Sequence, residues 1–96
     1  MLFVSTSKLY ISTAECTTLK EKRSIIKSII TSVRAKFNVS IAEIGDNDHT
    51  KKAYLGLCFV SNEKRFSEEV LSKVVAFIDR RHPGRIEDFD LEIFAR

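Results

Sequence analysis

Asp46, Asp48 and His49 stand close together in one short segment and come nearest to a catalytic or metal-binding cluster in this sequence. Carboxylate and imidazole groups at such spacing are able to ligate a cation. Hard cations, however, need more oxygen ligands than this segment offers. Together with Gly45 and Asn47, these residues are typical of turns, where Asn and Asp side chains hydrogen-bond to the nearby backbone. The segment therefore predicts a turn, and we expect no metal site here.

The two cysteines, Cys16 and Cys58, are the second possible source of chemistry. Their separation does not match a metal-binding motif. Cys58 lies among apolar residues, where a cysteine usually acts as a small hydrophobic side chain. Cys16 lies in a connecting segment and is expected to be exposed, but no neighbouring basic residue is placed to activate its thiol. With only three glycines, the chain also lacks a Gly-rich phosphate loop. We expect no cofactor and no enzymatic activity.

The third candidate is electrostatic, because positive charge is concentrated between Leu19 and Phe37. That segment holds six basic side chains and one acidic one, a net charge of +5, whereas the whole chain has +3 and the remainder therefore −2. At helical spacing, four of the basic residues fall within about 60° of one another, namely Lys20, Arg23, Lys27 and Arg34. A stripe of this kind is either a solvated helix face or a surface that binds the phosphates of RNA or another polyanion.

The helix that carries this basic stripe has a recognisable beginning and an apolar face. Thr18 and Glu21 have the spacing of a capping box, in which each side chain satisfies a free backbone donor. Asn38, which tolerates the left-handed conformation, is expected to end the helix after about Phe37. Apolar residues recur along one side at helical spacing, and they are Leu19, Ile25, Ile26, Ile29, Ile30, Val33 and Phe37.

Lys22 is the exception on this helix, because its position falls inside the apolar face. Its aliphatic stem could pack on the core while the ammonium reaches solvent at the edge of the layer. Alternatively, the ammonium could be partly buried against a carboxylate. We expect a carboxylate within salt-bridge distance in either case, with Glu43 as the first candidate.

Length and composition predict one soluble domain, spanning residues 1–96. Its 44% hydrophobic and 30% charged residues are ordinary for a globular protein. There is no apolar stretch long enough for a membrane span, and the first residues do not read as a secretory segment. Without a signal segment, the cysteines are expected to be reduced thiols in the cytoplasm.

The remaining elements follow from hydrophobic periodicity. We expect strands at residues 2–11, 39–44, 51–60 and 86–94, and a second helix that follows a Ser61–Asn62 cap and runs to about Arg81. A parity change between Ile41 and Ala42 suggests a bulge in the second strand. The order strand, helix, strand, strand, helix, strand predicts an α+β ferredoxin-like βαββαβ sandwich. Its antiparallel sheet should have the order 4-1-3-2, with both helices on one face.

The other face of that sheet would be open. In the last strand, Phe89, Leu91 and Ile93 are expected to be buried, with Asp88, Asp90 and Glu92 on the open face, where they would repel phosphate. Gly56 occupies the place where RNA-recognition modules carry a base-stacking aromatic, so RNA binding is expected on the helix stripe. A semi-apolar centre on the open face is the basis of an alternative function, a homodimeric structural or small-ligand-binding module. Its residues are Val4, Tyr10, Tyr54, Cys58 and Val60.

The sequence also resembles the YlxP-like family of small bacterial proteins over essentially its whole length. The resemblance rests on strings that occur in the family's order and spacing, namely Leu19-Lys20-Glu21-Lys22-Arg23, Phe37-Asn38-Val39-Ser40, Ala42-Glu43, Leu55-Gly56, Val60-Ser61-Asn62 and Glu68-Glu69-Val70-Leu71. Residues 14–17 depart from it, because members often carry a Pro-Gly-type turn there. The resemblance implies a ferredoxin-like fold and a gene near those for translation initiation and ribosome maturation. Ribosomal RNA or a ribosomal particle is therefore the expected partner. The resemblance implies no catalytic residues.

Overall fold

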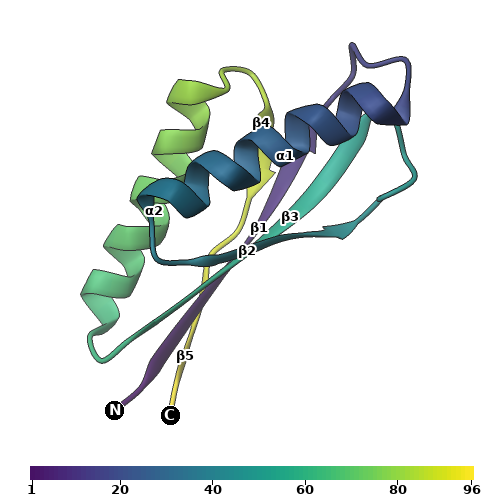
Figure 1. Cartoon of the computed structure of the whole chain (residues 1–96). Helices are drawn as coiled ribbons and strands as arrows, with labels where there is room; N and C mark the ends of the chain where they lie inside the picture. Colours follow the sequence, from purple (N-terminus) through teal and green to yellow (C-terminus); the bar gives the residue numbers. More distant parts are fainter.

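The computed structural model describes every residue from Met1 to Arg96. Two helices pack on one face of an antiparallel sheet (Figure 1). Neither helix has an apolar stretch long enough to cross a lipid bilayer. In chain order the elements are β1 (Phe3–Ser12), α1 (Leu19–Lys36), β2 (Ser40–Gly45), β3 (Lys52–Ser61), α2 (Lys64–Arg81), β4 (Ile86–Phe89) and β5 (Glu92–Ala95).

The strand order confirms the ferredoxin-like prediction. The sheet runs β2-β3-β1-β4, which is the expected order read from the other edge, and β5 continues the line of β4 along β1. β1 and β3 pair over their full ten residues, from Phe3 opposite Ser61 to Ser12 opposite Lys52. At the far end of β1, Leu2 and Arg96 exchange two backbone hydrogen bonds, so the chain ends lie side by side (Figure 1).

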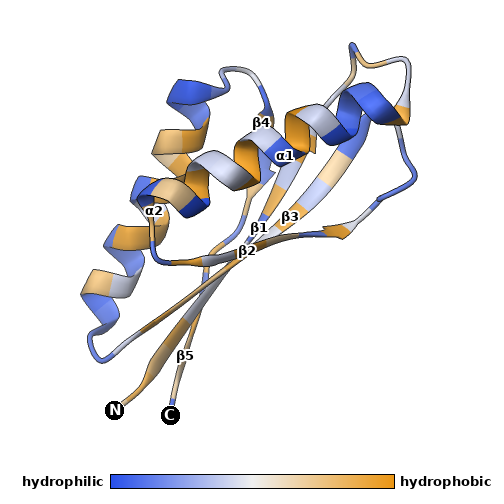
Figure 2. Ribbon diagram, in the orientation of Figure 1, coloured by the Kyte–Doolittle hydropathy of each residue, from blue (hydrophilic) through white to orange (hydrophobic).

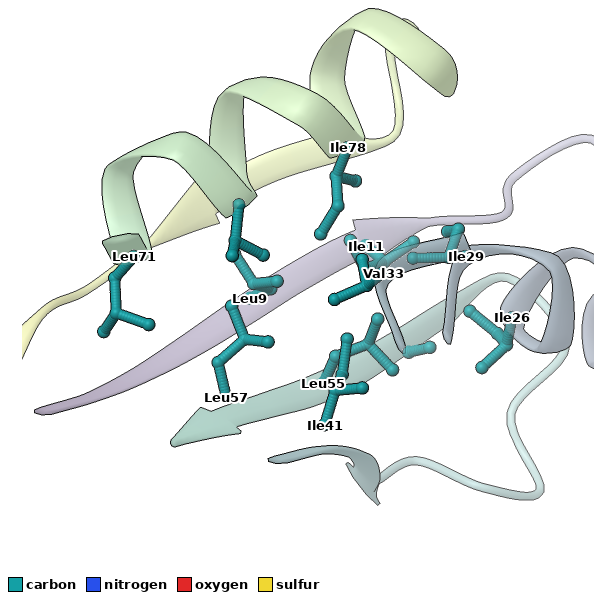
Figure 3. Packing of buried hydrophobic residues seen from close by; sticks show 12 residues of the cluster. Leu9, Ile11, Ile26, Ile29, Val33, Ile41, Leu55, Leu57, Leu71 and Ile78 are labelled. Atoms are coloured by element: carbon teal, nitrogen blue, oxygen red, sulfur yellow. The ribbon is translucent and has the colours of Figure 1, made fainter. Parts of the chain in front are cut away.

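The core lies between the sheet and the helices, because the strand alternation directs every second side chain towards the helix layer. Figure 2 shows hydrophobic and hydrophilic residues alternating along both helices, as expected for helices with one buried face. Twelve buried hydrophobic residues form one cluster (Figure 3), and they are Leu9, Ile11, Ile26, Ile29, Val33, Ile41, Ala53, Leu55, Leu57, Leu71, Val74 and Ile78.

The beginning of α1 follows the capping prediction. The Thr18 hydroxyl oxygen accepts from the backbone N–H of Glu21 at 3.1 Å. The Glu21 carboxylate in turn accepts hydrogen bonds from the hydroxyls of Thr17 at 2.8 Å and Thr18 at 3.1 Å. These bonds lower the pKa of Glu21 below its ordinary value, with the bond from Thr17 making the largest contribution. The first turn is therefore held by a network of three side chains.

Two other helix ends differ from the prediction. Asn38 does not end α1 in a left-handed conformation, since Asp46 is the only non-glycine residue with a positive φ. Instead, Phe37 is already extended and its N–H bonds to the Val33 carbonyl, so the chain passes directly towards β2. At α2, the N-cap residue is Glu63, and Ser61 contributes by accepting from the Glu63 N–H.

The edge strands also depart from the expected pattern. The irregularity in β2 lies between Glu43 and Gly45, later than the parity change between Ile41 and Ala42 suggested. The last strand is divided after Phe89, and Phe89 and Leu91 are 50% and 41% exposed instead of buried. They lie at the outer edge of the sheet, where they line open pockets beside α2 that leave both side chains partly accessible to solvent.

Candidate functional site

The basic stripe lies along the edge of the sheet. Arg23, Lys27 and Arg34 are exposed and line one groove of about 410 Å³ between α1 and β2. The remaining lining residues are Ile26, Ile30, Thr31, Ala42 and Glu43. Lys20, the fourth predicted residue, is exposed on the first turn of α1 and does not line the groove. The structure thus brings together three of the four residues of the stripe.

β2 forms one wall of this groove, and it is an edge strand that pairs only with β3. The Arg34 guanidinium donates to the Ile41 carbonyl at 2.9 Å, which satisfies a backbone acceptor that would otherwise face solvent at the edge. Arg23 and Lys27 take part in none of the four ion pairs of the molecule. Their charges are therefore not compensated by carboxylates of the protein.

Lys22 does not line the groove, but it neutralises the negative charge that Glu43 would otherwise contribute to it. Its side chain is completely buried, and its Nζ lies 3.2 Å from a carboxylate oxygen of Glu43. The same Nζ donates to the Asp46 carbonyl. The predicted partnership with Glu43 is confirmed, and the ammonium does not reach solvent. Because Glu43 is the only acidic residue lining the groove, its pairing with Lys22 leaves the groove strongly positive.

A second basic cluster, which was not predicted from the sequence, lies where the end of α1 meets α2. The Lys36 ammonium at the end of α1 lies 4.9 Å from the centre of the Phe77 ring of α2, within the range of a cation–π contact. The Phe37 and Phe77 rings meet edge to face at 5.5 Å. Lys73 and Arg80 complete the lining of a groove of about 240 Å³ at this junction. In the sequence, the helical spacing of Lys73, Phe77 and Arg80 was the one feature that could have indicated this cluster.

Acidic residues gather at the opposite edge of the sheet. A groove of about 420 Å³ between α2 and β4 is lined by Asp79, Glu87 and Asp88, with Ile86 and Phe89 among its apolar residues. Three of the 13 acidic residues of the chain thus line a groove at the sheet edge opposite the basic groove.

The five residues predicted for the open face share one side of the sheet. Tyr10 pairs with Tyr54 and Val4 with Val60 across β1 and β3, and the two tyrosine rings meet edge to face at 4.8 Å. Cys58 lies opposite Thr6 on the same face and is half-buried. Two further apolar residues join this face, because Phe94 pairs with Val4 and the Ile44 side chain lies against Gly56.

The segment around Asp46 forms a turn. Asp46 has a φ of 57°, its carbonyl accepts from the His49 N–H, and His49 Nδ1 accepts from the Lys51 N–H. No three side chains of His, Cys, Asp or Glu lie close enough together anywhere in the molecule to hold a metal ion. Cys16 was expected to be exposed and is buried instead, because its segment folds back on Thr13 and Lys51.

Two side chains in the loops before α1 and after α2, Glu15 and His82, have shifted pKa values. The Arg85 guanidinium lies 2.7 Å from the Glu15 carboxylate and lowers its pKa through a side-chain hydrogen bond. His82, which follows α2, has a lowered pKa because burial disfavours its charged form and Arg81 and Arg85 are nearby. Neither group lines the basic groove.

Comparison with known proteins gives one family and several similar folds. Residues 4–91 match the model of the family described as "Protein of unknown function (DUF503)". A relative from Bacillus subtilis (strain 168), "Uncharacterized protein YlxP", is 48% identical to this chain over 61 residues. The match covers 64% of this chain and 66% of the relative, so this chain spans just under two thirds of the relative's length.

The similar solved structures share the fold at low sequence identity. The de novo designed protein Foldit4 has a TM-score of 0.59 at 12% identity, with 100% of this chain and 99% of that chain covered. A designed protein with a ferredoxin fold, LFR1 1, has a TM-score of 0.54 at 14% identity and coverages of 100% and 86%. A dimeric ferredoxin-like protein of unknown function from Thermobifida fusca has a TM-score of 0.53 at 11% identity and coverages of 99% and 92%.

Proposed function

This chain belongs to the DUF503 family of proteins of unknown function, and we propose its function from the site itself. The proposed function is that of a non-catalytic cytoplasmic factor that binds ribosomal RNA or a ribosomal particle. The observation that carries this proposal is the placement of Arg23, Lys27 and Arg34 in one groove. The carboxylate beside them, Glu43, is already paired with Lys22. The groove therefore offers uncompensated positive charge to phosphate groups.

The dimensions of the groove suit a nucleic-acid backbone. With a rise of about 1.5 Å per residue, Arg23 and Arg34 are separated by roughly 16 Å along the helix axis, with Lys27 between them. Phosphates of several successive nucleotides can be contacted over such a length. Each phosphate neutralised releases bound counterions, which supplies most of the affinity and makes it dependent on salt.

The basic cluster at the end of α1 extends this surface. Lys36, Lys73 and Arg80 surround two aromatic rings, Phe37 and Phe77, which are half-buried. Combined cationic and aromatic surfaces are common in proteins that bind single-stranded nucleic acid. The sheet is a poorer candidate, because Gly56 offers no aromatic ring and Asp88 shares the open face of the sheet with Tyr10.

Ribosomal RNA is the proposed polyanion because the genes of the YlxP-like family, which this sequence resembles, commonly lie near genes for translation initiation and ribosome maturation. The test is an electrophoretic mobility shift of ribosomal RNA at several salt concentrations, together with co-sedimentation with ribosomal particles from a cell lysate. We expect binding at low salt that is lost steeply as the salt concentration rises. An absence of binding at low salt would contradict the proposal.

A second candidate function is a structural or small-ligand-binding module that uses the open face of the sheet. The observation favouring it is the exposure of Ile44, Val60 and Phe94, each of which is more than half exposed. The protein of similar fold from Thermobifida fusca is described as dimeric, which is a precedent for self-association on this fold. Under this function the protein would show no salt-dependent affinity for RNA.

A further inference from the structure

The open face of the sheet carries three large apolar side chains that are more than half exposed. Neither helix covers it, since α1 and α2 both pack on the opposite face (Figure 1). Ile44 is 53%, Val60 56% and Phe94 51% exposed. We propose that a second copy of this chain covers this face, with sheet packed against sheet in a two-fold symmetric dimer. This inference does not depend on RNA binding, because the basic groove lies on the helix side of the sheet edge.

The apolar residues of the face form two groups at its two ends. At one end, Tyr10 and Tyr54 pair across β1 and β3, next to Ile44. At the other end, Val4 lies between Val60 of β3 and Phe94 of β5. Figure 2 shows the hydrophobic colouring of β1 and β3 near the chain ends, where the strands extend beyond the helices. Burial of aromatic and aliphatic side chains at both ends would hold two sheets together along their length.

The charges between these two groups favour a second copy over other occupants. Lys8 lies on the face between Thr6 and Tyr10, and Glu92 pairs with Thr6. Asp88 pairs with Tyr10. A surface that carries both positive and negative charges can pack against a second copy of itself. A two-fold axis then brings the lysine of one copy towards the carboxylates of the other. A nucleic acid would be repelled by the two carboxylates, and a strongly basic partner would leave Lys8 unpaired.

The size of the face is sufficient for a dimer of modest stability. β1 and β3 each contain ten residues, and at about 3.3 Å per residue they are roughly 33 Å long. Four strands about 4.8 Å apart give a face of roughly 500–600 Å² per copy. Two copies would then bury about 1,000–1,200 Å², an area typical of weak, transient interfaces. We therefore expect a dimer that dissociates on dilution.

The dimer would also have a consequence for the basic grooves. Sheet-to-sheet packing directs the helix layers of both copies outwards, so that the two α1 grooves lie on opposite sides of the assembly. Two linked binding surfaces raise the apparent affinity for a long polyanion without any new contact. This consequence rests on the proposed RNA binding, whereas the dimer itself does not.

The test measures the mass of the full-length chain in solution by sedimentation equilibrium over a range of concentrations. We expect a dimer of twice the 11.0 kDa chain mass that dissociates as the protein is diluted. Phe94→Glu places a charge on the open face and should give a monomer at every concentration. Phe89→Glu is the matched control, because Phe89 is equally exposed at 50% but faces the groove between α2 and β4.

Thermal unfolding would establish that both variants remain folded. If Phe94→Glu were unfolded, Val60→Lys, a second change on the open face, would replace it. The proposal is overturned if the natural chain is a monomer at the highest concentration. It is also overturned if the open-face variants remain dimeric, or if Phe89→Glu alone breaks the dimer.

Discussion

The Nζ of Lys22 lies 3.2 Å from the Glu43 carboxylate and donates to the Asp46 carbonyl, although the Lys22 side chain has no exposed surface. This one ammonium group therefore connects α1 to β2 and to the turn that follows β2. Glu43 is 18% exposed, so the carboxylate retains a partial route to solvent while the lysine has none. The two partners should respond differently to mutation.

Glu43→Gln leaves the buried Lys22 ammonium without a carboxylate and should be strongly destabilising. Loss of one partner from a buried ion pair costs about 3 kcal/mol or more. Lys22→Met should cost less, because Glu43 can turn towards solvent and the methionine fills the space of the lysine stem. Urea unfolding of both variants measures the difference.

Glu69→Gln is the control for this comparison. Glu69 pairs with Arg65 at 3.5 Å on the surface, where both side chains are at least half exposed. Exposed pairs contribute less than about 1 kcal/mol. Equal losses of stability in Glu43→Gln and Glu69→Gln would show that the buried position of Lys22 has no energetic consequence.

Thr18→Ala should destabilise the protein by about 1 kcal/mol, since it removes the side-chain acceptor at the N-terminus of α1. It also removes one of the two hydroxyls that donate to Glu21. Thr31→Ala, in the exposed middle of the same helix, should cause no loss because alanine favours helix formation. The midpoint of thermal unfolding, followed by circular dichroism, compares the two variants. A larger loss for Thr31→Ala would contradict the capping role.

The lowered pKa of His82 predicts a specific pH dependence. Its ordinary value is 6.5, and burial together with Arg81 and Arg85 lowers it in the folded protein. The unfolded chain therefore binds more protons below that pH, and stability should fall as the pH decreases through 6.5. His82→Gln removes this titration, so the difference in stability between neutral and mildly acidic pH should become smaller. An unchanged pH profile would show that His82 makes no contribution.

The elements and their order were predictable because the apolar residues follow the period of each element. The alternation of Leu55, Leu57 and Ala53 along β3 and the helical recurrence of Ile26, Ile29 and Val33 both mark the buried side. The capping of α1 was predictable from the spacing of Thr18 and Glu21. The pairing of Lys22 was predictable because its position falls inside the apolar face of the helix.

Features that depend on how elements meet were not predictable from periodicity. The contact between Phe37 and Phe77 requires the end of α1 to meet the C-terminal half of α2, and no local sequence pattern reveals this (Figure 1). The exposure of Phe89 depends on how far α2 extends over the sheet edge. Cys16 is buried because hydrogen bonds from Lys51 fold its loop inwards, a contact between distant residues.

The basic groove should determine how RNA affinity responds to salt. Arg23→Ala/Lys27→Ala removes two exposed cations that form no ion pair in the protein. If both contact phosphates, the slope of the logarithm of affinity against the logarithm of salt concentration should shrink by about 0.7 to 0.9 per lost contact. Stability should change by no more than about 0.5 kcal/mol, because both side chains are on the surface.

The matched control is Lys64→Ala/Arg65→Ala, which changes the net charge equally at the start of α2, near Glu63, Glu68 and Glu69. Lys73 is unsuitable as a control because it lines the second basic cluster with Lys36 and Arg80. The control variant should keep the slope and nearly all of the affinity. If both double variants weaken binding equally, the attraction comes only from the net charge of +3, and the groove between α1 and β2 is not a specific site.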